Sequence, residues 1–239
     1  MVSEGFDVHT HILPGMDDGA KNASESLRML ADAYAQGVRL CVATPHVVLH
    51  RNGDIDAFLR KRRESAISLA DAAKNSTLKL PDLLLGAEVY LDNNINVYPD
   101  IEKLCIGNTP CILVEFPIEK YDPYWGDWLH SMCLRGLHPI VAHIDRYVHA
   151  ERLLSDFTGL SITYQINASR MFSFSGRRFA ARLIENRQSC IFASDMHNLT
   201  TRKCNMKEAF HKVSKKFPQE ASSLFSLRAK NMLRHHEEM

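Results

Sequence analysis

The sequence lacks an excess of charge of either sign. Its 239 residues include 29 basic and 28 acidic side chains, which leaves a formal net charge of +1. Proteins that bind nucleic acid or anionic membrane surfaces usually carry a clear basic excess. The balance therefore argues against nucleic acid as a partner and against a membrane surface as a binding site.

Long apolar runs are also missing. No stretch approaches the roughly 20 apolar residues that a spanning helix needs. The N-terminal MVSEGFDVHTH has no basic segment followed by an apolar core, as a signal peptide would. The six cysteines form no CxxC pair, and three of them lie within apolar runs. We therefore expect no membrane insertion, and reduced, mostly buried thiols in a cytoplasmic protein.

Neither a GxGxxG nor a GxxxxGKS glycine fingerprint is present, which argues against an open, doubly wound nucleotide-binding sheet. What the sequence does have is a regular alternation of apolar runs and helical patterns. The runs are rich in Val, Ile, Leu and Cys and do not alternate with polar residues, which is typical of strands buried on both faces. They are FDVHTHI, RLCVATP, LLLGAEVYL, CILVEFP, HPIVAHI, SITYQINA and CIFASDMH.

The segments between these runs have apolar residues at helical spacing. The expected helices are 22–37, 55–75, one opened by Asp122-Pro123, 176–187, 206–216 and 219–235. Asn22 and Glu25 resemble a capping box, and Pro123 would take the first helical position. Seven strand–helix units predict an α/β fold, a distorted TIM-like (β/α)7 barrel, as a single domain over residues 1–239.

Metal-ligand residue types stand at the ends of nearly all the runs. They are His9, His11, His46, Glu88, Glu115, His143, Asp195 and His197. In a parallel barrel the C-terminal strand ends form the active-site face, so these side chains should meet there. Only the sixth run, which ends near Asn167, offers no ionisable ligand.

Two pairs in this set are two residues apart and so share one face of a strand: His9 with His11, and Asp195 with His197. Ionisable groups gathered at one barrel mouth would repel or stay unpaired without a cation. Imidazoles and carboxylates without thiolates suit Mn²⁺, Fe or Zn²⁺. The set is too large for one ion, so we expect two or three ions per chain, bridged by a carboxylate such as Glu88.

Positive charge follows two of the strand ends. Arg146 lies three residues after His143, and Arg202 lies five residues after His197. The planar guanidinium fork matches phosphate oxygens, and a multi-metal site activates water and clamps a phosphoryl group. The combination favours a phosphoesterase, although each arginine alone is equally compatible with an ordinary surface residue.

Several stretches carry a family resemblance: DVHTHILPGMDDGA, ATPH, GAEVYL, LVEFP, AHIDRY, QINASRM and SDMHN with Arg202 beyond. Through them the sequence resembles the polymerase-and-histidinol-phosphatase (PHP) superfamily. Within that superfamily it is similar to the bacterial capsule- and exopolysaccharide-associated, manganese-dependent protein-tyrosine phosphatases. The family usually reads HPERY where this chain has HIDRY.

The resemblance implies a distorted seven-stranded barrel with three metal ions, and it favours Mn²⁺ as the metal. It assigns His9, His11, Glu88 and Asp195 to the first ion, Glu88, Glu115 and His143 to the second, and Asp18, His46 and His197 to the third. It places Arg146 and Arg202 on the substrate phosphate. Asp17 is interpreted as a turn residue rather than a ligand.

The resemblance further implies that metal-activated hydroxide hydrolyses phosphotyrosine on a protein. The expected partner is the tyrosine-rich tail of a cognate capsule-system tyrosine kinase. The cysteine-dependent route is absent, because none of the six cysteines is followed by arginine six residues on. The alternatives are a phosphatase for a small phosphomonoester such as histidinol phosphate, a phosphodiesterase, and a non-catalytic metal-binding partner of the kinase.

A basic run and an aromatic cluster are each compatible with two interpretations. The run LRKRRE, residues 59–64, is either a solvated helix face or a docking site for an acidic kinase tail. Tyr124, Trp125 and Trp128 have helical spacing, which is compatible with core packing or with an aromatic rim that accepts a tyrosine ring.

Overall fold

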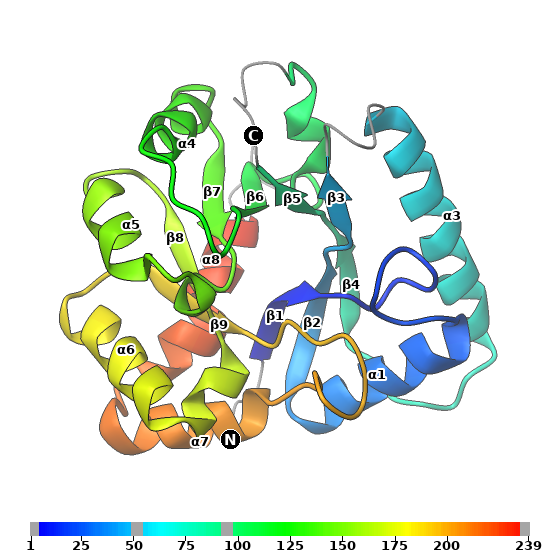
Figure 1. Cartoon of the computed structure of the whole chain (residues 1–239). Coiled ribbons are helices and arrows are strands. Elements are labelled where there is room, and N and C mark those ends of the chain that lie inside the picture. Colours follow the sequence, from blue (N-terminus) through cyan, green and yellow to red (C-terminus); the bar gives the residue numbers. More distant parts are fainter. Residues whose placement is uncertain (1–4, 49–54, 92–97, 235–239) are drawn as a thin grey trace.

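The computed structural model describes residues 5–48, 55–91 and 98–234. The strands in this part are β1 (Gly5–Thr10), β2 (Val38–Ala43), β3 (His46–Val48), β4 (Asp82–Leu85), β5 (Glu88–Tyr90), β6 (Cys111–Glu115), β7 (His138–Val141), β8 (Thr163–Asn167) and β9 (Cys190–Ala193). The α-helices are α1 (Ala23–Ala35), α3 (Ile55–Lys74), α4 (Trp125–Leu134), α5 (Ala150–Asp156), α6 (Phe174–Glu185), α7 (Met206–Lys216) and α8 (Arg228–Arg234). Most of the helices surround the strands, as Figure 1 shows.

All paired strands run parallel. One sheet has the order β1-β2-β4, and the other has the order β3-β5-β6-β7-β8-β9. Parallel strands need a crossover, and helices supply most of the crossovers. The predicted α/β class with parallel strands is therefore confirmed.

The two sheets continue into each other without forming one ladder. β2 leads through Thr44-Pro45 into β3, and β4 leads through Gly86-Ala87 into β5. Pro45 has no N–H to donate, which interrupts the ladder, although its carbonyl accepts the Glu88 N–H at 3.1 Å. At the other edge Thr10 forms one bridge to Met196, beyond β9. The described residues contain no single closed sheet, so the (β/α)7 barrel stays a prediction.

Most helix predictions are close to the observed bounds, and two need correction. Asn22 Oδ1 accepts the Glu25 N–H at 3.0 Å and begins α1, as the capping pattern predicts. The prediction that a helix opens at Asp122-Pro123 is wrong by about one half-turn. Asp122 Oδ1 accepts the Tyr124 N–H at 2.9 Å and holds a turn, so α4 begins at Trp125.

The last predicted helix, 219–235, is irregular. A π-helical turn at Ser223–Leu227 precedes α8, and residue 235 lies outside the described residues. α5 was not predicted, because seven residues give too short a periodic pattern to detect. Such differences leave the strand ends, and hence the site, in place.

The aromatic cluster after β6 is mainly a packing feature. Trp125 is buried and stacks on Phe116 with ring centroids 4.6 Å apart, and Trp128 is partly buried against the same core. Tyr124 alone is 63% exposed. The core interpretation is therefore correct for both tryptophans.

The cysteines also behave as predicted in their packing. All six are free, and all except Cys133 are buried. Within the described residues, no helix is both long and apolar enough to cross a membrane.

Candidate metal centre

Nine predicted ligands gather where the parallel strands end or restart. They are the imidazoles of His9, His11, His46, His143 and His197 and the carboxylates of Asp18, Glu88, Glu115 and Asp195. All are buried except His46 and Asp18, whose side chains are 33% and 65% exposed. The interruptions between β2 and β3 and between β4 and β5 bring His46 and Glu88 side by side in register. The cluster therefore combines a buried floor with an open side.

Two ligands leave their strands through left-handed backbone. His143 has φ 30° and Asp195 has φ 54°, and each stands two residues beyond its strand. L-residues pay about 1–3 kcal/mol for such conformations, which cluster at functional sites. The His143 N–H donates to Gln165 Oε1 at 2.6 Å, and the Asp195 N–H donates to the His9 carbonyl at 3.0 Å. These bonds hold both strained residues so that their side chains turn into the cluster.

His9 and His11 face each other through their Nε2 atoms. His9 Nδ1 lies 3.0 Å from Gln165 Oε1, and His11 Nδ1 lies 2.7 Å from Asp17 Oδ2. Both oxygens are acceptors, so each Nδ1 carries a hydrogen, and a ring that is neutral has only a lone pair at Nε2. The two Nε2 atoms are nevertheless only 3.1 Å apart. Only a proton or a metal ion between them relieves this contact.

Glu88 lies at the centre of the cluster. Its Oε2 is 3.1 Å from His9 Nε2, 3.2 Å from His11 Nε2 and 3.0 Å from His46 Nδ1. This oxygen nonetheless has no partner in hydrogen-bond geometry. Its other oxygen lies 3.0 Å from His143 Nε2, which is also 3.3 Å from Glu115 Oε1. A carboxylate surrounded by imidazole nitrogens in this way fits a bridging metal ligand.

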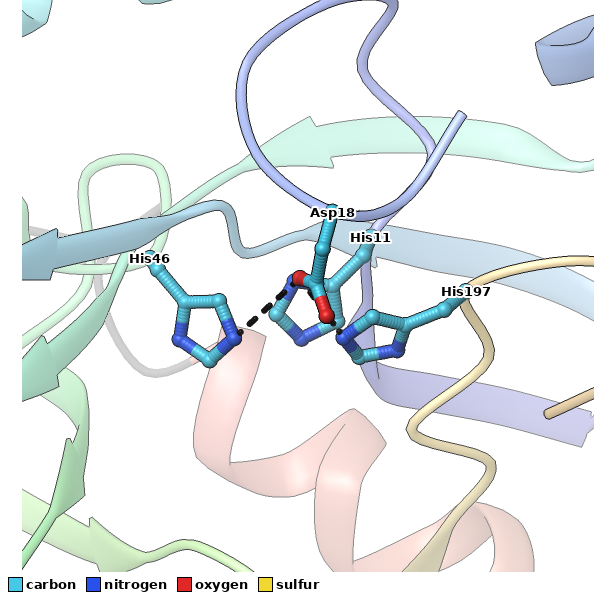
Figure 2. Close-up of side chains that lie close together, drawn as sticks. All are labelled: His11, Asp18, His46 and His197. Carbon is cyan, nitrogen blue, oxygen red and sulfur yellow. Dashed lines mark ion pairs between the residues drawn. The ribbon is translucent and has the colours of Figure 1, made fainter. Parts of the chain in front are cut away.

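The open side of the cluster is formed by Asp18, His46 and His197. Figure 2 shows Asp18 reaching down from its loop between the two imidazoles, with His11 behind. Asp18 Oδ1 lies 3.3 Å from His197 Nε2 and 3.6 Å from His46 Nε2. His197 Nδ1 faces the Asp195 carbonyl at 3.0 Å, which leaves its buried Nε2 without a hydrogen-bond partner. These three side chains form a second set of inward-facing ligand atoms, in which Asp18 is exposed, His46 is partly exposed and His197 is buried.

The loop after β1 is folded back tightly onto the strand. The Ala20 N–H donates to the His11 carbonyl at 3.0 Å. A Cβ at Gly19 would lie 2.0 Å from that carbonyl oxygen, so only glycine fits here. This close return explains Gly19, the last residue of the motif PGMDDG, and places both aspartates beside the imidazoles.

Asp17 is more than a turn residue. Besides His11 Nδ1, its carboxylate accepts the His46 N–H at 3.0 Å and the Gly19 N–H at 3.0 Å. A carboxylate on the outer nitrogen of a metal-binding histidine fixes the ring's tautomer and orientation. The sequence interpretation missed this role, although the position of Asp17 next to Asp18 was a usable signal.

The sixth predicted run, now β8, contributes amides instead of ligands. Gln165 Oε1 accepts from His9 and from the His143 N–H, and Gln165 Nε2 donates to Asn167 Oδ1 at 2.8 Å. Asn167 Nδ2 in turn donates to Asp195 Oδ2 at 3.0 Å. The backbone N–H of His143 fixes which end of the Gln165 amide is oxygen. β8 thus orients His9 and Asp195 together, a role that the sequence interpretation missed.

Both predicted phosphate-binding arginines lie beside Asp195. Arg202 Nη2 is 2.8 Å and 2.9 Å from its two carboxylate oxygens, and Arg146 Nη1 is 3.6 Å from Oδ2. Arg146 follows Asp145 of the HIDRY sequence. Asp145 is buried, accepts the Asn167 N–H at 2.8 Å and lies 3.2 Å from Arg170 Nε. This anchored aspartate holds the loop and directs Arg146 toward the cluster.

Protons balance part of the negative charge of the cluster. Burial alone would lower the pKa of His11, but the neighbouring carboxylates of Asp17 and Glu88 raise it to about 10. Burial likewise opposes charge on His143, yet Glu115 and Glu88 raise its pKa to about 10. Burial and the neighbouring His11 lower the pKa of His197 to about 4. Cationic character is thus held at the centre of the cluster, where divalent ions would replace these protons.

The donor positions form overlapping groups rather than three separate sites. Ligand atoms lie within 4.8 Å of one another in three sets: His11, Asp18, His46 and His197; His9, His11 and Asp195; and His46, Glu88 and Glu115. Shared members are what several neighbouring ions with bridging ligands require. The orphaned buried atoms Glu88 Oε2 and His197 Nε2 fit such ions as well.

Comparisons with known proteins agree with this chemistry. A family model described as "Capsular polysaccharide synthesis, CpsB/CapC" matches residues 5–234. The chain is 30% identical to the tyrosine-protein phosphatase YwqE of Bacillus subtilis (strain 168), and the match covers 96% of this chain and 92% of YwqE. It is 29% identical to the tyrosine-protein phosphatase CpsB of Streptococcus agalactiae serotype III (strain NEM316), covering 97% and 99% of the two chains.

A solved structure extends the likeness to three dimensions. It is described as one of the crystal structures of YwqE from Bacillus subtilis and CpsB from Streptococcus pneumoniae, unique metal-dependent tyrosine phosphatases. The TM-score is 0.82 at 29% identity, with 96% of this chain and 94% of that chain covered. The resemblance to capsule-associated tyrosine phosphatases is therefore confirmed.

Proposed function

The chain belongs to the CpsB/CapC family of capsular polysaccharide synthesis, and we propose that it is a metal-dependent phosphatase that hydrolyses phosphotyrosine on proteins. The observation that carries the proposal is the contact between His9 Nε2 and His11 Nε2 at 3.1 Å, with both outer nitrogens committed to acceptors. Only a shared proton or a cation stabilises this arrangement, and a divalent ion would replace the proton. The contact links the metal-dependent tyrosine phosphatase activity named for the relatives to specific atoms of this chain.

The ligand set remains a proposal of two or three ions per chain. It comprises His9, His11, Asp18, His46, Glu88, Glu115, His143, Asp195 and His197. The mixture of imidazoles and carboxylates supports Mn²⁺, with Fe or Zn²⁺ as the other candidates. When bound, such ions supply Lewis acidity that lowers the pKa of water and neutralises phosphoryl oxygens.

The chain's own residues would position the substrate. Arg146 and Arg202 are about one-third exposed and point at Asp195 from the open side. Their guanidinium groups would bind the oxygens of a phosphoryl group lying over the cluster. Aimed cationic donors of this kind stabilise charge that develops in the transition state. Glu88 and the histidines keep the floor of the site dry and fixed.

The proposal also includes the predicted barrel, the single domain, the partner kinase and the cytoplasmic location. An interrupted seven-stranded barrel is supported by the Thr10–Met196 bridge and by the continuation of β2 into β3 and of β4 into β5. We propose one domain for the whole chain. The capsule-system tyrosine kinase stays the predicted partner, and a cytoplasmic location stays the predicted setting.

The experiment compares substrates under metal control. Chelator-treated protein is assayed with a phosphotyrosine peptide, histidinol phosphate and a nucleotide diester, before and after addition of Mn²⁺. We expect hydrolysis only with metal and the highest kcat/KM on the phosphotyrosine peptide. His9→Ala should abolish the activity, while His130→Ala, which changes an exposed histidine of α4, should not.

Three results would contradict the proposal. Activity that persists in chelator would exclude metal dependence. A higher kcat/KM on histidinol phosphate or on the diester would favour the small-molecule alternatives. A metal-loaded protein without turnover on any substrate would favour a binding partner of the kinase.

A further inference from the structure

A basic cavity lies along α7, and none of its lining residues belongs to the proposed active site. Its volume is about 840 Å³, and it lies between the end of α1, the start of β2, the short 3-10 helix Ala168–Phe172 and α7. Four cationic side chains line it: Arg39, Lys207, Lys212 and Lys215. Arg39 already donates to the Tyr34 and Val38 carbonyls at 2.9 Å, so the three lysines carry the available charge. Glu208 is the single acidic residue in the lining. The cavity is therefore suited to an anionic ligand.

The lysines of α7 that line the cavity have no ion-pair partner among the described residues. Lys207 lies in the first turn, where the helix dipole disfavours a positive charge. Lys212 and Lys215 are like charges three residues apart, although Lys215 lies in the last turn, where the helix dipole favours it. In the described chain, Lys216 pairs with Glu185 at 2.8 Å, but no ion pair neutralises Lys207, Lys212 or Lys215. Among the described residues the three lysines thus leave positive charge at the cavity without an ion-pair partner, which an anionic ligand would supply.

An aromatic ring stands at the same cavity. Phe172 is 44% exposed, and Lys212 Nζ lies 5.4 Å from the centre of its ring. An exposed ring next to free ammonium groups offers a stacking surface for one aromatic ring and counter-charge for a phosphate. Phosphotyrosine combines these two features.

The cavity is connected to the proposed active site through a short segment. Arg202 and Lys207 are five residues apart, so their Cα atoms are separated by at most about 18 Å. The carboxamide of Gln36, a cavity residue, donates to the Cys204 carbonyl in the middle of this segment. An extended peptide of about six residues spans the same distance.

From these observations we infer that the cavity bounded by α7 and Phe172 binds a second phosphotyrosine of the substrate polypeptide while the first is hydrolysed at the metal centre. The inference rests on the proposed function, because it assumes a phosphotyrosine protein as substrate. Two linked contacts raise affinity through effective concentration. The enzyme would thus prefer segments that carry several phosphotyrosines.

The basic run on α3 is a weaker candidate for this role. Lys61 Nζ donates to the Met16 carbonyl at 3.3 Å, and Arg62 donates to the Gly86 carbonyl at 2.7 Å. These two side chains are already used to hold the loop after β1 and the interruption after β4. Arg60 and Arg63 are exposed and provide a matched control on the same molecule.

The test measures KM and kcat of the metal-loaded enzyme on O-phospho-L-tyrosine and on peptides with one phosphotyrosine or with two placed six residues apart. Wild-type enzyme should have the lowest KM for the doubly phosphorylated peptide. Lys207→Glu/Lys212→Glu should raise that KM about tenfold at unchanged kcat and leave the KM for O-phospho-L-tyrosine unchanged. Phe172→Ala should give a smaller rise, and Arg60→Glu/Arg63→Glu should give none.

Several results would overturn the inference. They are an unchanged KM in the α7 variant, an equal rise in the α3 variant, or a loss of binding to phosphatidylserine vesicles without a change in peptide KM. If the wild-type enzyme hydrolyses none of the three substrates, the proposed function fails. Binding of the doubly phosphorylated peptide, measured by fluorescence anisotropy, then tests the cavity separately. Loss of binding in Lys207→Glu/Lys212→Glu supports the inference, and unchanged binding overturns it.

Discussion

Replacing Gln165 with leucine isolates the contribution of β8 to the metal centre. Gln165→Leu keeps a side chain of similar size but removes three buried hydrogen bonds, to His9 Nδ1, to the His143 N–H and to Asn167 Oδ1. Each buried group left unpaired costs about 1–3 kcal/mol. The apolar leucine recovers part of this by burial. We therefore expect the metal-free variant to lose about 2–4 kcal/mol of unfolding free energy, measured by urea denaturation.

The same change should weaken metal binding. Without an acceptor at Nδ1, His9 can carry its hydrogen on Nε2, which blocks the lone pair that would bind the ion. Asn167 also loses the bond that orients it toward Asp195. Loss of such an outer partner typically costs 10–100-fold in metal affinity, or about 1.4–2.7 kcal/mol. Competition with a chelator of known affinity measures this, and nitrogen NMR reports the tautomer of His9.

The control lies on the same strand. Thr163, at the other end of β8, bonds His138 Nε2 at 2.9 Å and Ser189 Oγ at 3.0 Å. Thr163→Val should therefore reduce stability by about 1–2 kcal/mol without changing metal affinity. The reasoning is refuted if folded Gln165→Leu binds Mn²⁺ as tightly as wild type, or if Thr163→Val loses as much affinity.

The remaining predictions concern the other residues of the site. Asp17→Asn should weaken metal binding about 10–100-fold at unchanged stoichiometry, whereas Asp18→Asn should release one ion per chain, as elemental analysis will show. Arg202→Ala should lower kcat/KM on a phosphotyrosine peptide by about 100-fold at full metal content. Arg202→Lys should have a kcat/KM between those of wild type and Arg202→Ala. Equal kcat/KM in all three proteins would remove the arginine from the mechanism. His11 and His143 have pKa values raised to about 10 in the metal-free fold, above the ordinary 6.5. The protonated histidines stabilise the fold fully below pH 6.5, and this stabilisation is lost as the pH rises to 10. The Tm of metal-free protein should therefore fall over that range, while its affinity for Mn²⁺ rises. A Tm that does not change with pH would contradict these protonation states.

The sequence was informative about the site because parallel strands bring their ends together. His143 and Asp195 are 52 residues apart, yet strand-end position alone predicted that they meet. Period and residue type were enough for this. They were not enough for the sheet, because the interruption at Thr44-Pro45 and its match at Gly86-Ala87 depend on how neighbouring strands align.

The outer partners were harder to predict for a physical reason. Whether Gln165 packs, pairs or faces solvent depends on the direction of one amide, and that direction is set here by the His143 N–H from another strand. Asp17 looked like a turn residue because its neighbours Pro14 and Gly15 form a turn. Its actual partners are His11, which directly follows β1, and the His46 N–H of β3. Such directional contacts are tertiary and leave no periodic signal.

The outer partners also explain how the fold tolerates so unfavourable a cluster. Gln165 and Asp17 come from different elements, and each holds the Nδ1 hydrogen and the orientation of one histidine before any ion arrives. Left-handed His143 and Asp195 add strain of about 1–3 kcal/mol each. A cation that binds only the folded chain offsets these costs through linkage. The ligands are therefore arranged for ion binding at the expense of the metal-free fold, which is why removal of one partner should lower metal affinity and stability together.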